Sequence, residues 1–127
     1  VVKHIQSRLM CHTDISGIAR YEGDPYFRVS DELPGNPWII TTLWLAQYYI
    51  QNATSESELE EPIKLLDWAA QRALSSGALP EQINPYTGEQ LSATPLTWSH
   101  AEYVATVILY LEKLEELGVA QKCNPIK

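Results

Sequence analysis

The most constraining feature of this sequence is a run at residues 38–50 that is apolar on nearly every side of a helix. Its start is marked by Asn36, whose side-chain oxygen suits the N-cap position. Pro37 follows at the first helical position, where its missing N–H costs nothing. A helix that is apolar around its whole circumference is stable only when other elements cover every face. The run therefore predicts a buried helix in a protein larger than this 127-residue chain.

Three further segments show the apolar spacing of amphipathic helices. Together with the apolar run, the predicted helices span residues 1–12, 36–50, 55–77 and 99–118. The connections at 13–35 and 78–95 are rich in Gly, Pro and Ser, and they are longer than most loops of compact domains. Within them we expect a short strand at 18–21 and a turn at 84–88. Long helices joined by long loops indicate an all-α fold class with roughly four helices.

Individual residues predict how the later helices begin and which side faces the core. Ser55 and Glu58 have capping-box spacing, as do Ser99 and Glu102, so we expect each serine to cap its helix. Gly77 is a natural stop for the third helix. One apolar stripe of the last helix is expected to face the core, and it comprises Val104, Val107, Ile108, Leu111 and Leu114.

Charge and cysteine content exclude several classes of function. Asp and Glu number 16 against 9 Lys and Arg, so the net charge is −7 and favours neither nucleic acid nor an anionic membrane as partner. No apolar run reaches the roughly 20 residues that a membrane helix needs. Cys11 and Cys123 stand far apart, without the spacing of a metal site or a disulfide framework. We therefore expect inert cysteines and no metal, and mildly favour a reducing, cytoplasmic compartment.

The long loops and the helix starts beside them hold the residues with chemical potential. Trp38 and Trp98 stand next to the loops, whereas Trp44 and Trp68 lie inside helices and are expected in the core. Indole faces beside polar groups are a common way to hold sugars, because the apolar C–H face of a pyranose packs on the ring. Taken alone, a loop glutamate such as Glu81 is usually a solvated surface residue.

Four motifs together resemble glycoside hydrolase family fifteen, the glucoamylase family. They are Gly17-Ile-Ala-Arg-Tyr-Glu-Gly-Asp-Pro-Tyr26, Gly35-Asn-Pro-Trp38, Leu79-Pro-Glu-Gln82 and Pro95-Leu-Thr-Trp-Ser-His-Ala101, and they occur in the family's order. The resemblance implies an (α/α)6 barrel, of which residues 1–127 would form about half, as a C-terminal fragment of one catalytic domain. It also implies an exo-acting enzyme that releases glucose, with inversion, from the non-reducing ends of starch-type oligosaccharides.

The resemblance assigns roles to six residues. Glu81 matches the general base that deprotonates the attacking water. Ser92 matches a serine that hydrogen-bonds this carboxylate, and such a bond favours the ionised form. The other four match residues that line the sugar-binding pocket: Arg20, Asp24, Trp38 and Trp98. The implied ligand is an α-glucan or maltooligosaccharide, with no cofactor.

One member of the family's catalytic pair has no match in this sequence. Inverting hydrolysis needs a second carboxyl group as general acid, roughly 6.5–9.5 Å from the base. Glu22, Glu89 and Glu102 are the nearest substitutes, but none lies in a matching motif. We therefore expect the acid in a missing N-terminal half of the barrel. The isolated chain is expected to be inactive or nearly so, and to associate with that half or with itself.

Two other interpretations remain open at the level of sequence. The chain could be a non-catalytic helical fragment, or a regulatory or binding module, because a fold alone does not guarantee turnover. Among enzymes, it could belong to a relative that cleaves trehalose or dextran. A tryptophan- and glutamate-rich acid motif upstream would favour the enzyme over the binding module.

Overall fold

The structure, a computed structural model, describes residues 1–119. In chain order it comprises α1 (Val2–Arg8), α2 (Ile39–Asn52), the 3₁₀-helix η1 (Glu56–Leu59), α3 (Glu60–Ala70), β1 (Gln82–Ile83), β2 (Gln90–Leu91) and α4 (Thr97–Glu116). Four α-helices against two strands of two residues each make the described part all-α, consistent with a fragment of a helical barrel. Among the described residues, no helix combines the length and the apolar character required to cross a membrane.

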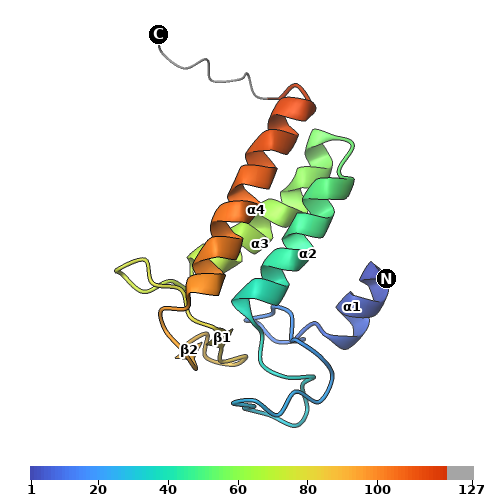
Figure 1. The fold of residues 1–127 in the computed structure, drawn as a ribbon. Coiled ribbons are helices and arrows are strands. Elements are labelled where there is room, and N and C mark those ends of the chain that lie inside the picture. Colours follow the sequence, from blue (N-terminus) through green and yellow to red (C-terminus); the bar gives the residue numbers. More distant parts are fainter. Residues whose placement is uncertain (120–127) are drawn as a thin grey trace.

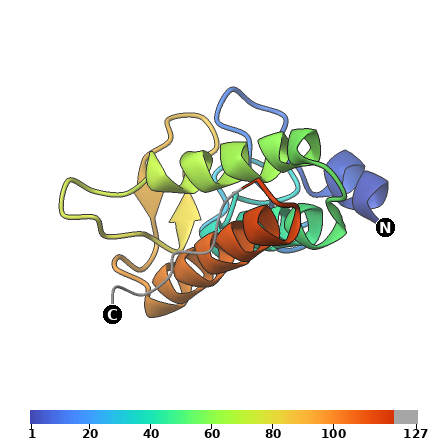
Figure 2. The same ribbon diagram turned by 90° about the horizontal axis from the view of Figure 1, so that it is seen from above.

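The three long helices pack together around the core (Figures 1 and 2). Helices α2 and α4 run in the same direction, and α3 returns antiparallel to both (Figure 1). The main core cluster consists of Ile39, Leu43, Leu66, Ala69 and Ile83. Partly buried side chains of α3 and α4, such as Trp68 and Tyr110, pack against it. Trp68 therefore contributes to the core, as its position inside a helix predicts.

The long loops gather at the end of the bundle where α2 and α4 begin (Figure 1). We call these two segments, residues 9–38 and 71–96, the loop layer. β1 and β2 form an antiparallel pair around the turn predicted at 84–88. Single β-bridges connect β1 to Trp38, Trp38 to Ile18, and Ile18 to Met10. Segments that are distant in the sequence therefore lie edge to edge below the helices. The expected strand at 18–21 is wrong, because its pairing is limited to these bridges.

The first loop approaches the bundle closely at Gly17. Its φ of +97° lies in the left-handed region, and a Cβ at this position would come within 2.6 Å of the side chains of Pro37 and Trp68. Only glycine satisfies both conditions without displacing its neighbours. The indole of Trp68 donates a hydrogen bond of 2.7 Å to the carbonyl of Ile15, which holds the loop against α3.

The first two helices have different bounds from those that the sequence predicts. α1 ends at Arg8 instead of residue 12, and none of its seven residues is buried. α2 begins at Ile39, after an extended residue at Trp38, so Asn36 and Pro37 precede the helix and do not cap it. The cause is tertiary: the side chain of Asn36 is buried and makes its hydrogen bonds elsewhere in the loop layer.

The capping boxes predicted for the later helices are absent, because neither helix has a side-chain hydrogen bond at its N-cap. The carboxylate of Glu58 accepts hydrogen bonds from the backbone N–H (2.7 Å) and hydroxyl (2.9 Å) of Thr54, one residue before the expected partner. α3 ends at Ala70, before Gly77. α4 begins at Thr97, and the hydroxyl of Ser99 donates to the carbonyl of Pro80 (2.7 Å) instead of capping its own helix.

The predicted core stripe of α4 is correct only in part. Val107 and Leu114 pack against the core clusters. Val104, Ile108 and Leu111 point away from the core, and between 49 and 57% of their surface is exposed. The reason is that α4 packs on α2 and α3 through a neighbouring stripe that includes Tyr103, Thr106 and Tyr110.

Trp44 likewise departs from the core position expected for it, because 45% of its surface is exposed. Its ring centroid lies 5.9 Å from that of Trp98, at an interplanar angle of 60°. Five other large apolar side chains of α2 and α4 are likewise between 44 and 57% exposed: Tyr48, Trp98, Val104, Ile108 and Leu111. We call the exposed apolar surface of these six residues the open face.

Cys11 is fully buried in the loop layer, and its thiol donates to the carbonyl of Gly35 at 3.3 Å. Burial raises the pKa of this thiol to about 11. A thiol that ionises so weakly is a poor nucleophile, in line with the inert role expected for it. Cys123 lies outside the described residues.

Candidate active site

Glu81 stands at the point where the loop layer meets the start of α2. Its backbone N–H donates to the carbonyl of Ala93 (2.9 Å), and its carbonyl accepts from the N–H of Ile39 (3.2 Å). The residue is thus held between the segment after β2 and the first turn of α2. The two backbone contacts place its side chain, which is half-buried, at the loop end of the bundle.

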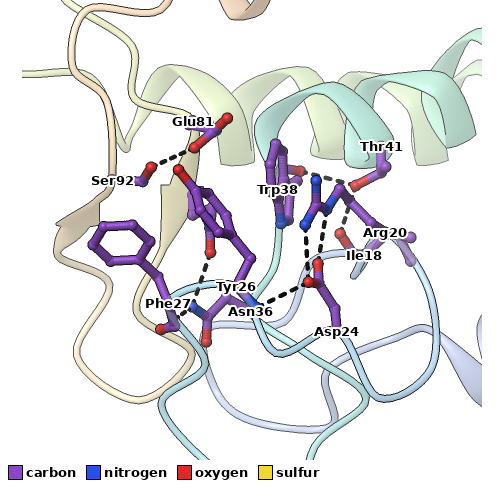
Figure 3. A network of polar contacts seen from close by, with 11 residues as sticks. Ile18, Arg20, Asp24, Tyr26, Phe27, Asn36, Trp38, Thr41, Glu81 and Ser92 are labelled. Atoms are coloured by element: carbon purple, nitrogen blue, oxygen red, sulfur yellow. Dashed lines mark hydrogen bonds and ion pairs between the residues drawn. The ribbon is translucent and has the colours of Figure 1, made fainter.

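The hydroxyl of Ser92 donates a hydrogen bond to the carboxylate of Glu81 (Figure 3). Ser92 has a φ of +63°, in the left-handed region that residues other than glycine rarely adopt. Strained backbone of this kind clusters at functional sites, where the surroundings impose it. The sequence-based pairing of Ser92 with Glu81 is thus present as a direct contact, although the roles of both residues stay a prediction.

Arg20 and Asp24 form a bidentate ion pair. The guanidinium Nε and Nη2 donate to the two carboxylate oxygens at 2.8 and 2.9 Å, and the backbone N–H of Tyr26 adds a third bond at 3.0 Å. Only 1% of Asp24 is exposed. Chiefly because of the hydrogen bonds from Arg20, the pKa of Asp24 is lowered from its ordinary value. The same hydrogen bonds raise the pKa of Arg20, so both groups stay charged at neutral pH.

Aromatic rings join this ion pair to the Glu81–Ser92 contact. The guanidinium carbon of Arg20 lies 4.0 Å from the ring centroid of Trp38 and 5.4 Å from that of Tyr26. The rings of Tyr26 and Trp38 lie between the ion pair and the Glu81–Ser92 contact (Figure 3). Carboxylate, guanidinium and aromatic faces are therefore assembled side by side. Trp38 is buried beneath Arg20, with 3% of its surface exposed, whereas the ring of Tyr26 is 45% exposed. The Tyr26 ring and the Arg20 guanidinium can therefore hold a polar ring compound by stacking and by hydrogen bonds to its hydroxyls.

Trp98 has different surroundings. It lies in the first turn of α4, and 51% of its surface is exposed. Its indole N–H donates to Glu102 at 3.3 Å, and its ring faces Trp44. The contacts of Trp98 thus belong to the open face and not to the Arg20–Trp38 cluster, so its expected place in the sugar pocket stays a prediction.

The three glutamates considered as substitute acids all have partners in the structure. Glu22 forms an exposed ion pair with Arg8 (3.2 Å). Glu89 accepts from the hydroxyl of Thr87 (3.2 Å). Glu102 accepts from Trp98 and from the side-chain amide of Gln47 (2.7 Å). Between residues 1 and 119, no group of three or more His, Cys, Asp and Glu side chains comes together to hold a metal ion.

Sequence reasoning did not identify two buried amides beside the site, Asn36 and Gln82. The Nδ2 of Asn36 donates to the Oε1 of Gln82 at 2.9 Å, and both side chains are buried. The sequence predicts a helix cap at Asn36, because this residue precedes Pro37. Gln82 directly follows Glu81, but no local pattern distinguishes a buried glutamine from an exposed one.

Comparison with known proteins places this site in context. Residues 59–108, which include Glu81, Ser92 and Trp98, match the family model described as glycosyl hydrolases family 15. An uncharacterized glycosyl hydrolase of Methanocaldococcus jannaschii is 38% identical over 102 residues. That match covers 73% of this chain but only 15% of the length of the relative. The chain is therefore a partial domain of the glycosyl hydrolase family 15 type.

Proposed function

We propose that this chain is part of an inverting, exo-acting α-glucosidase of the glucoamylase type, with Glu81 as the general base. The observation that carries the proposal is the direct contact between the Ser92 hydroxyl and the Glu81 carboxylate, beside the Arg20–Asp24 pair and Trp38. A carboxylate that accepts a hydrogen bond is held in one orientation. It can then take a proton from a water molecule placed on one face of a bound sugar ring.

The proposed reaction consists of two proton transfers on opposite faces of the sugar ring. Glu81 removes a proton from the water, whose oxygen attacks the anomeric carbon as the glycosidic bond breaks. The leaving oxygen takes a proton from a general acid on the opposite face of the ring, and attack by the water from the Glu81 face inverts the configuration to β-glucose. The half-buried Arg20 hydrogen-bonds sugar hydroxyls, while the buried carboxylate of Asp24, for which sugar contact was expected, holds the guanidinium in place.

The general acid is proposed to lie outside residues 1–127. Glu22, Glu89 and Glu102 lie in no motif that matches the acid of the family, and each is bonded to side chains other than Glu81 and Ser92. The chain covers 15% of the length of its M. jannaschii relative, so most of a complete enzyme of that size lies elsewhere. In the complete protein, the open face would pack against the missing N-terminal half of an (α/α)6 barrel, or in its absence against a second copy.

The proposal is tested by glucose release from maltooligosaccharides with the full-length protein that contains these residues. We expect Glu81→Gln to lower kcat by a factor of 100 or more, because removal of a general base typically costs about 10²–10⁴. Glu115→Gln, on the exposed far end of α4, is the matched control and should keep full activity. NMR of the fresh product should show the β-anomer first.

The isolated 127-residue chain should release no glucose, with or without the substitution. If full-length Glu81→Gln is as active as the wild type, Glu81 is not the base. If the full-length wild type binds maltooligosaccharides without cleaving them, the chain belongs to a binding module of the same fold.

A further inference from the structure

We propose that Asn36 and Gln82 act as a positioning pair that holds Glu81 at a set distance from the loop of Arg20 and Asp24. The proposal deepens the proposed function and rests on it for its effect on catalysis. Its structural basis is the hydrogen bond of 2.9 Å between the two amides, which are 1% and 0% exposed. Two buried amides bonded to each other join segments that are 46 positions apart.

The orientation of both amides is determined by the backbone around them. The Oδ1 of Asn36 accepts from the N–H of Val29 (3.1 Å), and its Nδ2 donates to the carbonyl of Phe27 (2.8 Å; Figure 3). The second hydrogen of Nδ2 then points to Gln82, which must present its oxygen. A rotated Gln82 amide would bring two NH2 groups together, so the pair has one arrangement.

This arrangement leaves the Nε2 of Gln82 buried without a hydrogen-bond partner among the described residues. An unpaired buried donor carries a desolvation cost, so the pair is not optimised for stability alone. What the arrangement does achieve is a link between two parts of the site. Phe27 and Val29 directly continue the loop that contains Asp24 and Tyr26, and Gln82 is the neighbour of Glu81.

The backbone carries this link to Glu81. The N–H of Ile83 donates to the carbonyl of Pro37 (2.9 Å), and the carbonyl of Glu81 accepts from the N–H of Ile39 (3.2 Å). The Asn36–Gln82 bond connects the same two extended segments, residues 36–39 and 81–83. Through its neighbour Gln82, Glu81 is thus linked to Asn36 and the loop of Arg20 and Asp24. Its carboxylate contacts Ser92. Neither amide needs to touch the substrate, so both are positioning residues.

NMR of the 127-residue chain tests the link without reference to activity. We expect Asn36→Ala to shift the signal of the Glu81 carboxyl carbon and the amide signals of Val29 and Ile83. Leu59→Ala removes a buried side chain from the separate cluster with Ile50 and Ala53, and as the control it should leave the Glu81 carboxyl signal in place. An unchanged Glu81 signal in Asn36→Ala overturns the proposal.

Kinetics of the full-length enzyme test the consequence. Asn36→Ala is expected to lower kcat by about 10- to 100-fold with little change in KM, because a displacement of a catalytic group by about 1 Å can cost a factor of 100. Gln82→Ala should have a similar effect, and the double variant should lose little more, as residues acting as one unit do. Leu59→Ala should lose stability but keep its kcat.

If Asn36→Ala does not fold, Asn36→Asp keeps the acceptor for Val29 and removes both donors, and the same loss of kcat is expected. Wild-type kcat in a folded Asn36 variant, while Glu81→Gln is inactive, would refute the positioning pair and leave the proposed function intact. Full activity in Glu81→Gln would instead refute the proposed function, while the NMR result still decides whether the two amides position Glu81.

Discussion

The loop layer and helix α4 differ in how much of themselves they bury. α4 is the longest regular element, yet its buried residues are two polar ones, Ser99 and Thr106. The loop layer has little regular structure, but it fully buries Cys11, Ala19, Asp24, Asn36 and Gln82. Regularity is therefore a poor guide to which part of this molecule is the more completely packed.

The difference follows from how each region satisfies its backbone and its apolar surface. A helix pairs its own N–H and C=O groups, so α4 can exist with one apolar side uncovered. An irregular segment must find partners for these groups elsewhere. The loops do so through β-bridges and through the buried side chains of Asp24 and Asn36. The open face thus leaves apolar surface uncovered in this chain, whereas the loops find partners within the chain for much of their backbone and for their buried carboxylate.

The largest expected effect on stability distinguishes a side chain in the core between the helices from one on the open face. Leu43→Ala, in the core between α2 and α3, should lower the free energy of unfolding by about 3 kcal/mol. Ile108→Ala, on the open face, should change it by less than about 0.5 kcal/mol, because the side chain is 49% exposed. Urea denaturation of the 127-residue chain measures both.

The same open-face residue should matter for association. The wild-type chain is expected to form dimers or larger species in sedimentation at tens of micromolar, and Ile108→Glu to return it to a monomer. Leu74→Glu is the control, because Leu74 is similarly exposed but lies in the loop after α3. A wild-type monomer would show that the open face requires no partner, and would weaken the contrast with the loop layer.

An intermediate effect is expected in the loop layer and depends on pH. The folded state lowers the pKa of Asp24 below its ordinary value of 3.8, first through the hydrogen bonds from Arg20. The stability that this ion pair contributes is therefore present above about pH 4 and is lost as pH falls through the folded pKa. Asp24→Asn should cost about 2 kcal/mol at pH 7 and flatten the acid side of the stability curve.

Stability measured between pH 2 and 7 checks this prediction. Asp67→Asn, on the charged outer side of α3, is a suitable control. An acid limb with the same slope in Asp24→Asn and wild type would mean that the ion pair does not stabilise the loop layer.

The smallest effect on stability is expected for the exposed contact between Glu58 and Thr54 before α3. The Glu58 carboxylate bonds Thr54, and these bonds lower the pKa of this exposed group. Glu58→Gln should lower Tm by only about 1–2 °C at neutral pH, because exposed capping contacts are weak and screened by solvent. Calorimetry in low and high salt measures it, and a larger decrease than for Asp24→Asn would reverse the ranking of the two layers.

Much of the architecture could be predicted from the sequence, because it depends on local pattern. The apolar run at 38–50 predicts a buried helix, and α2 places eight of its residues in the interior. The resemblance to the family implies the contact between Ser92 and Glu81, and the structure contains it. The core positions predicted for Trp44 and for the outer side of α4 are wrong. Apolar character favours burial, but it does not determine which residues reach the core of this chain.

What the sequence by itself determined is therefore the all-α class, the family and the positions of the loops and motifs. Only the tertiary structure determined three hydrogen bonds. Asn36 donates to Gln82 instead of capping α2, the carboxylate of Glu58 accepts from Thr54, and Ser99 donates to the carbonyl of Pro80. The physical reason is that a polar side chain can satisfy its hydrogen bonds locally or across the fold at similar energy. Burial then selects the partner, and burial is a property of the assembled molecule.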